Sequence, residues 1–165
     1  MKFTGKAALA ATGVLVLAGT APPSGAQTAA HTGDHRVVTP QDIRWSPAPP
    51  SVPRGAEMAL LYGDPGKEGP FAMRLKFPAN YRIAPHTHPA HEIVTVISGT
   101  FSVGMGETAD KGKAQALPAG SLFGYPPGTP HFAFIDEETV IQITTTGPWG
   151  LSYVNPADDP RRQPQ

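Results

Sequence analysis

Short runs of alternating apolar and polar residues recur along most of the chain. Between residues 71 and 77, large apolar side chains alternate with small or charged ones, as in a strand with one buried face: Phe71, Met73, Leu75 and Phe77. Eight further short apolar or β-branched runs are bounded by turn-forming residues: 56–62, 81–88, 92–98, 100–104, 121–125, 132–135, 139–145 and 151–154. No run after the first 26 residues has sustained helical periodicity. The pattern predicts an all-β antiparallel sandwich or barrel.

Neighbouring strands suggest how this sheet is paired. We expect residues 92–98 and 100–104 to pair across Gly99, and residues 132–135 and 139–145 to form a hairpin across a solvated acidic turn at 136–138. Residues 43–45, just before the proline-rich stretch 47–53, are predicted to form an edge strand that wraps the domain.

The first 26 residues have a different pattern. Lys2 and Lys6 precede an apolar run over residues 7–21, and Ser24 and Ala26 place small side chains at positions −3 and −1 of a cleavage site. This is the layout of a secretory signal peptide. The run is too short and too rich in Ala, Gly and Thr for a membrane anchor, which needs about 20 strongly apolar residues. We therefore predict cleavage after Ala26 and an exported protein, periplasmic or extracellular, with no membrane association once the signal is removed.

The remaining length predicts one domain. We expect a signal peptide at 1–26, a mobile arm and proline-rich edge segment at 27–55, a barrel at 56–155 and a tail at 156–165. His31 and His35 lie in the arm and are expected to be solvent-exposed. The chain has no cysteine, so disulfides cannot stabilise it, and packing must suffice with the help of bound metal or a partner subunit.

Charge excludes two classes of partner. Loss of Lys2 and Lys6 leaves 11 of the 13 basic residues against 13 acidic ones, a formal charge of −2 on the mature chain. Binding to nucleic acid or to an anionic membrane surface would need clustered Lys and Arg. We expect a small-molecule substrate or ligand instead.

One segment carries the strongest chemical signal. His86 and His88 are two residues apart in a predicted strand, so both imidazoles point to the same side. Pro89 interrupts the strand and allows the chain to return Glu92 to the same point. His131 follows a rigid Pro-Pro-Gly turn at 126–128 and can supply a fourth group. Imidazole nitrogens and a carboxylate oxygen are ligands for a divalent metal ion.

These two segments resemble the paired motifs of the cupin family. The first motif matches at His86, His88, Glu92 and Gly99, and the second matches at Gly120, Pro126, Gly128 and His131. The resemblance covers residues 56–154. Two positions depart from the pattern. Asn80 replaces a glycine, although Asn tolerates left-handed backbone angles, and Ile135 replaces an asparagine that is not a metal ligand in the family.

The resemblance implies an antiparallel double-stranded β-helix, also called a jelly-roll or cupin barrel, and it is consistent with a homodimer. It also implies one divalent transition metal held by His86, His88, Glu92 and His131, with Fe, Mn, Zn, Ni, Co and Cu all open. Two enzyme chemistries remain, a dioxygenase and a Lewis-acid isomerase or lyase. A non-catalytic module that binds a small ligand or a metal is the alternative.

Three further residues are candidates for the surroundings of this site. His91 precedes Glu92 and has the opposite parity to His88, so we expect it to point away or to donate a hydrogen bond to a ligand. Gln142 is polar within an apolar run, and it faces either the lumen or the solvent. Tyr125 ends the strand before the Pro-Pro-Gly turn and could line a pocket.

Overall fold

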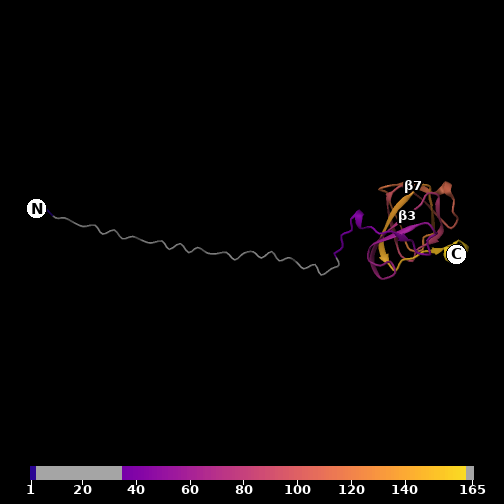
Figure 1. Cartoon of the computed structure of the whole chain (residues 1–165), viewed down its shortest axis with the longest axis horizontal. Helices are drawn as coiled ribbons and strands as arrows, with labels where there is room; N and C mark the ends of the chain where they lie inside the picture. Colours follow the sequence, from indigo (N-terminus) through magenta and orange to yellow (C-terminus); the bar gives the residue numbers. More distant parts are fainter. Residues whose placement is uncertain (3–34, 163–165) are drawn as a thin grey trace. The chain divides into compact units, whose positions relative to one another are not determined.

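The computed structural model describes residues 1–2 and 35–162, and the chain divides into two units, Met1–His35 and Arg36–Gln165. The second unit contains every element discussed below (Figure 1). The predicted signal peptide and His31 lie outside the described residues, apart from Met1 and Lys2. His35 is described and is exposed, as expected.

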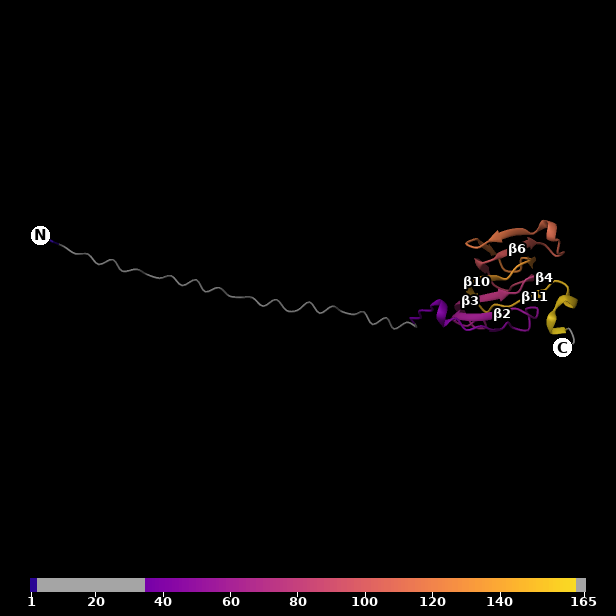
Figure 2. The ribbon, with the colours of Figure 1, turned by 45° about the horizontal axis from the view of Figure 1, so that its top comes forward.

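Two antiparallel sheets form the fold, and the all-β prediction is confirmed. The first has the strand order β1 (Ser46–Pro47), β2 (Glu57–Tyr62), β3 (Gly69–Phe77), β10 (Thr139–Gly147), β5 (Glu92–Ser98) and β8 (Leu122–Tyr125). The second has the order β11 (Ser152–Tyr153), β4 (Tyr81–Thr87), β9 (His131–Ile135), β6 (Thr100–Met105) and β7 (Gln115–Pro118). Figure 2 shows several of these strands and the connections between them.

Helical structure in the described part of the chain is limited to four short 3₁₀ turns: η1 (Pro40–Asp42), η2 (Lys111–Lys113), η3 (Pro156–Asp158) and η4 (Pro160–Arg162). Within the described ranges, no helix has the length and apolar character needed to cross a membrane.

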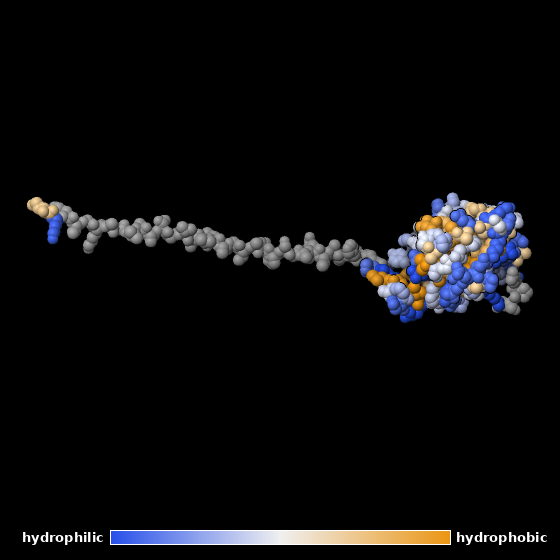
Figure 3. All heavy atoms as spheres, turned by 90° about the horizontal axis from the view of Figure 1, so that it is seen from above, coloured by the Kyte–Doolittle hydropathy of each residue, from blue (hydrophilic) through white to orange (hydrophobic). Residues whose placement is uncertain are grey.

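The core lies between the inner faces of the two sheets. In β3 the predicted alternation is confirmed: Phe71, Met73, Leu75 and Phe77 are buried. The same parity places Ile141 and Ile143 of β10 in the core, while their neighbour Gln142 faces the opposite side of the sheet. Outward-facing apolar residues remain on the surface, where Figure 3 shows them interspersed with polar ones.

Both predicted hairpins are wrong. β5 and β6 follow one another across Gly99 but belong to different sheets, and the same is true of β9 and β10. β10 pairs instead with β3 and β5, and β9 pairs with β4 and β6. The physical reason is burial: each sheet covers its apolar face only by packing on the other, so these short turns carry the chain across a corner of the barrel.

Two smaller differences concern strands at sheet edges. The edge strand expected at residues 43–45 is instead β1, which begins at Ser46 and pairs with β2. β7, which pairs with β6, lies in a segment whose polar and proline-containing sequence gave no strand signal. Edge strands need only one partner and one buried face, so their composition is weakly constrained.

Left-handed backbone conformations occur at the turns that the sequence motifs marked. Asn80 has φ 58°, which confirms that Asn replaces glycine in a left-handed turn. Gly99 has φ 73°, and a Cβ added there would lie 2.5 Å from the Glu138 carbonyl oxygen and 2.5 Å from Thr139 Oγ1. Gly120 has φ 88° with nothing within 4 Å of such a Cβ.

Gly99→Ala and Gly120→Ala should therefore differ in how far they lower the free energy of unfolding. We expect Gly120→Ala to lower the free energy of unfolding by about 1–2 kcal/mol, the backbone penalty alone. Gly99→Ala should lower the free energy of unfolding by about 1–3 kcal/mol more, because the turn between β5 and β6 must also open to admit the methyl group. Urea denaturation of both variants measures this difference, and equal losses would contradict the steric account of the corner.

Candidate metal centre

A β-bulge in β4 turns His86 into the barrel, and His88 follows directly after this strand. Ile83 lies opposite Ala133 of β9, but the next registered pair is His86 with His131, so β4 has two intervening residues where β9 has one. The extra residue reverses the inward and outward positions. Ile83 and His86 therefore both face inward despite their odd separation. His88 is two residues further on and also faces inward, as predicted.

The remaining predicted ligands come from two other strands. His131 is the first residue of β9, and Glu92 is the first residue of β5 in the opposite sheet. The Pro-Pro-Gly turn before β9 is tied to the site because the Gly128 N–H donates to the His88 carbonyl oxygen over 2.9 Å. Both sheets thus contribute to one cluster.

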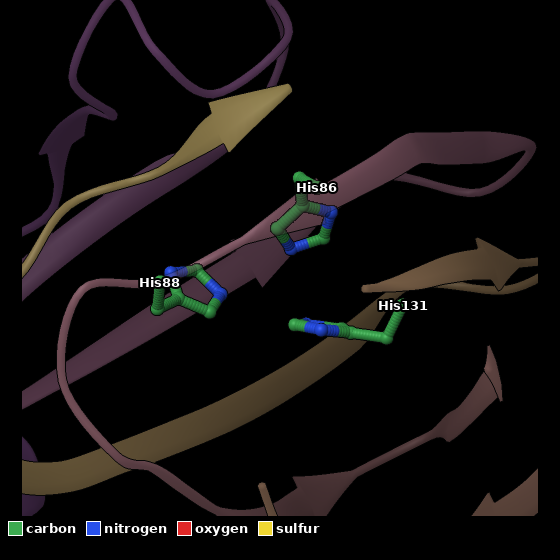
Figure 4. Close-up of side chains that lie close together, drawn as sticks. All are labelled: His86, His88 and His131. Carbon is green, nitrogen blue, oxygen red and sulfur yellow. The ribbon is translucent and has the colours of Figure 1, made fainter. Parts of the chain in front are cut away.

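The four side chains are buried and close together. His86, His88 and His131 each place one ring nitrogen within 4.8 Å of the others, and the three rings face one another in Figure 4. Glu92 lies beside this trio: Oε1 is 3.4 Å from His88 Nε2, and Oε2 is 3.0 Å from His131 Nε2. The four residues are only 3% to 6% exposed.

Backbone carbonyls fix the tautomer of each imidazole. Nδ1 of His86 donates to the Ala84 oxygen over 2.8 Å, Nδ1 of His131 donates to the Thr129 oxygen over 3.0 Å, and Nδ1 of His88 donates to the Gly150 oxygen over 2.6 Å. A carbonyl only accepts, so Nδ1 carries the proton and a neutral ring keeps its lone pair on Nε2. This is the arrangement in which histidine binds a metal.

The charges in the cluster follow from burial and mutual contact. Burial, followed by the neighbouring His131 and His88, lowers the pKa of His86 to about 3, so this ring is neutral. Burial would raise the pKa of Glu92, but close contact with the rings of His131 and His88 outweighs it and holds that pKa well below its usual range. Burial likewise opposes protonation of His131, yet contact with Glu92 raises its pKa. The cluster holds an ionised carboxylate.

These residues fit a divalent metal ion. His88 Nε2 and Glu92 Oε2 are buried and have no hydrogen-bond partner among the described residues. A buried polar atom without a partner costs about 1–3 kcal/mol, and here both atoms are acceptors in a group with negative charge. A cation satisfies such atoms, and imidazole nitrogens with a carboxylate suit a transition metal.

The segment after β10 covers the cluster, a position that the sequence pattern alone left open. The Trp149 ring stacks on His88 with centroids 4.3 Å apart and an interplanar angle of 14°, next to the Gly150 carbonyl that orients the same ring. Trp149, Phe123 and Leu151 line a pocket of about 20 Å³ together with the four predicted ligands. Only the tertiary contacts identify Trp149, since nothing in its local sequence does.

The three other candidate residues lie in different places relative to the cluster. Tyr125 lies opposite Glu92 in register, with its ring centroid 5.0 Å from that of His131, and burial followed by the charge of Glu92 raises the pKa of its hydroxyl. His91 is exposed, and its backbone carbonyl accepts a bond from Thr145. Gln142 lies on the outer face, where it accepts a hydrogen bond from Arg74. Strand parity thus places Gln142 away from the pocket.

Comparison with known proteins gives both sequence relatives and fold relatives. Germin-like protein 9-3 from Oryza sativa subsp. japonica is 36% identical over 80 residues, which are 48% of this chain and 37% of that protein. Germin-like protein subfamily 2 member 1 from Arabidopsis thaliana is 49% identical over 49 residues, 29% of this chain and 22% of that protein. The chain therefore spans well under half the length of these curated relatives.

Solved structures share the fold at low identity. The polyketide cyclase RemF from Streptomyces resistomycificus superposes with a TM-score of 0.64 at 16% identity, covering 76% of this chain and 89% of that one. KdgF from Halomonas sp. gives a TM-score of 0.52 at 24% identity, covering 70% and 96%. An RmlC-like cupin protein from Ralstonia eutropha JMP134 gives 0.57 at 21% identity, covering 74% of each chain.

A family model described as the ChrR Cupin-like domain matches residues 33–150, which include all four predicted ligands and most of both sheets. The cupin resemblance read from the two histidine motifs is thereby confirmed. The chain belongs to the ChrR Cupin-like domain family, and so to the cupin superfamily.

Proposed function

We propose that this chain is a metal-dependent enzyme that acts on a small molecule at the cluster of His86, His88, Glu92 and His131. One observation carries the proposal: three imidazoles, each held by a carbonyl at Nδ1, bring their remaining nitrogens together beside an ionised carboxylate. Four protein ligands would leave two positions of a six-coordinate ion for water, dioxygen or a substrate oxygen, or one if Glu92 binds through both of its oxygens.

The protein's own contribution is positioning and enclosure. Ala84, Thr129 and Gly150 orient the rings through their carbonyl oxygens, and Glu92 would offset part of the charge of a bound divalent ion. The mainly apolar pocket of about 20 Å³ admits little more than one small group. Only a compact reacting group of the substrate can therefore reach the cluster without movement of the surrounding side chains.

Two reaction classes are compatible with this ligand set. A redox metal such as Fe would supply oxygen activation, as in a dioxygenase, whereas Zn, Mn or Ni would supply Lewis-acid polarisation of a carbonyl or hydroxyl, as in an isomerase or lyase. The structural neighbours do not choose between them, because a fold shared at low identity hosts many chemistries. The identity of the metal is therefore the most informative measurement.

Metal content tests the ligand set directly. Protein purified without chelators and reconstituted should contain about one transition-metal ion per chain by elemental analysis. His88→Ala should lose the ion, while His91→Ala should keep it, because His91 is exposed and outside the cluster. Glu92→Gln should weaken binding about tenfold or more with the fold intact by circular dichroism. Clearly substoichiometric metal after reconstitution would refute the site.

Turnover distinguishes an enzyme from a binding module. The reconstituted protein should convert a substrate in panels for oxygenases, isomerases and lyases, and the activity should disappear in His88→Ala and remain in His91→Ala. A protein that keeps its metal and binds ligands but turns over nothing in all three panels would instead be the non-catalytic cupin module.

We also propose that the protein is exported, on the basis of the basic, apolar and small-residue pattern of residues 1–26. Expression of the full chain in a bacterial host should yield a periplasmic or extracellular product whose first residue is Gln27 by N-terminal sequencing. Ala26→Asp should block cleavage, because position −1 requires a small neutral side chain. A cell-associated product that retains its first residues would contradict export.

A further inference from the structure

Two consecutive residues, Trp149 and Gly150, both contact the His88 ring. The Gly150 carbonyl accepts a hydrogen bond from His88 Nδ1, and the Trp149 indole stacks on the same ring. The Trp149 backbone N–H donates to the Pro65 oxygen over 2.7 Å, and its ring packs against Phe71 with centroids 6.2 Å apart. The indole therefore contacts both His88 and Phe71, and it forms part of the pocket wall.

The indole N–H differs in kind from the other unsatisfied atoms of the site. Trp149 Nε1 is buried and has no hydrogen-bond partner among the described residues, as is also true of His88 Nε2 and Glu92 Oε2. The last two are acceptors, and a cation can satisfy them. Trp149 Nε1 is only a donor, so a cation cannot satisfy it. It requires an acceptor atom, and all three residues line the same pocket.

We infer that the pocket takes a small oxygen-anion ligand, such as a carboxylate, and that Trp149 donates its indole N–H to one oxygen of it. The inference rests on the proposed metal site, where an open coordination position would hold another oxygen of the ligand. The pocket has a volume of about 20 Å³, room for about one water-sized group, so the ligand can enter it with one small polar end only. Trp149 is then the residue that selects an acceptor-bearing ligand.

Acetate is the probe for this inference, and cobalt(II) is the reporter. Wild-type protein and Trp149→Phe are loaded with Co²⁺, and acetate is titrated while the visible absorption of the ion is followed. Phenylalanine keeps an aromatic ring against His88 but removes the donor. We expect Co²⁺ affinity to change less than about threefold and acetate affinity to fall about tenfold, the effect of losing one charge-assisted hydrogen bond.

The chain supplies a matched control, since Trp45 is the other of its two tryptophans. The Trp45 ring lies under Lys76, with Nζ 4.8 Å from its centroid, and it does not line the pocket. Trp45→Phe should leave both affinities unchanged. It also assigns the two indole N–H signals of ¹⁵N-labelled, Zn²⁺-loaded protein. Acetate should shift the Trp149 signal downfield and leave the Trp45 signal in place, which tests the contact even if Trp149→Phe fails to fold.

Each outcome decides the question. Failure of the wild type to bind Co²⁺ or Zn²⁺ would overturn the proposed metal site itself. Metal binding without any response to acetate would overturn only the ligand class. Equal acetate affinity in Trp149→Phe, an unshifted Trp149 indole signal, or a loss of Co²⁺ affinity as large as the loss of acetate affinity would show that Trp149 merely supports His88.

Discussion

Four buried side chains that accept hydrogen bonds converge on one point, and the surrounding structure is arranged to hold them there. Imidazole lone pairs and a carboxylate repel one another in a medium of low polarity unless a cation or a proton lies between them. Glu92 stays ionised and His86 stays neutral, while contact with Glu92 raises the pKa of His131. A metal ion removes this conflict, and binding it would then stabilise the fold as well as supply chemistry.

The imidazole rings are oriented by backbone carbonyls from well-separated parts of the chain. The Ala84 and Thr129 carbonyls are local, each two residues before the histidine that it orients. The Gly150 carbonyl is 62 residues from His88 in sequence. The stretch after β10 therefore has to return to the start of the site, and it brings Trp149 with it. Orientation of one ligand and enclosure of the pocket are achieved by the same segment.

The pocket combines acceptors that suit a cation with one donor that does not. The two kinds of unsatisfied atom restrict the ligand independently, because acceptors need a cation or a donor and the indole donor needs an acceptor. The histidines and Glu92 call for a metal, whereas the indole N–H calls for an oxygen acceptor beside it. Tyr125 adjoins His131, and burial together with the charge of Glu92 raises the pKa of its hydroxyl, which stays protonated.

The sequence alone determined the strand pattern, the inward pairing of His86 with His88 and the approach of Glu92 and His131, because strand parity and turn residues are local properties. It also predicted the left-handed turn at Asn80, since few other side chains tolerate that conformation. Strand partners could not be predicted in this way: the hairpins expected at Gly99 and at 136–138 are corners between sheets, because burial of both apolar faces outweighs pairing of neighbours. The β4 bulge and the stacking of Trp149 on His88 likewise depend on register and on contacts across the barrel, and only the tertiary structure decides those.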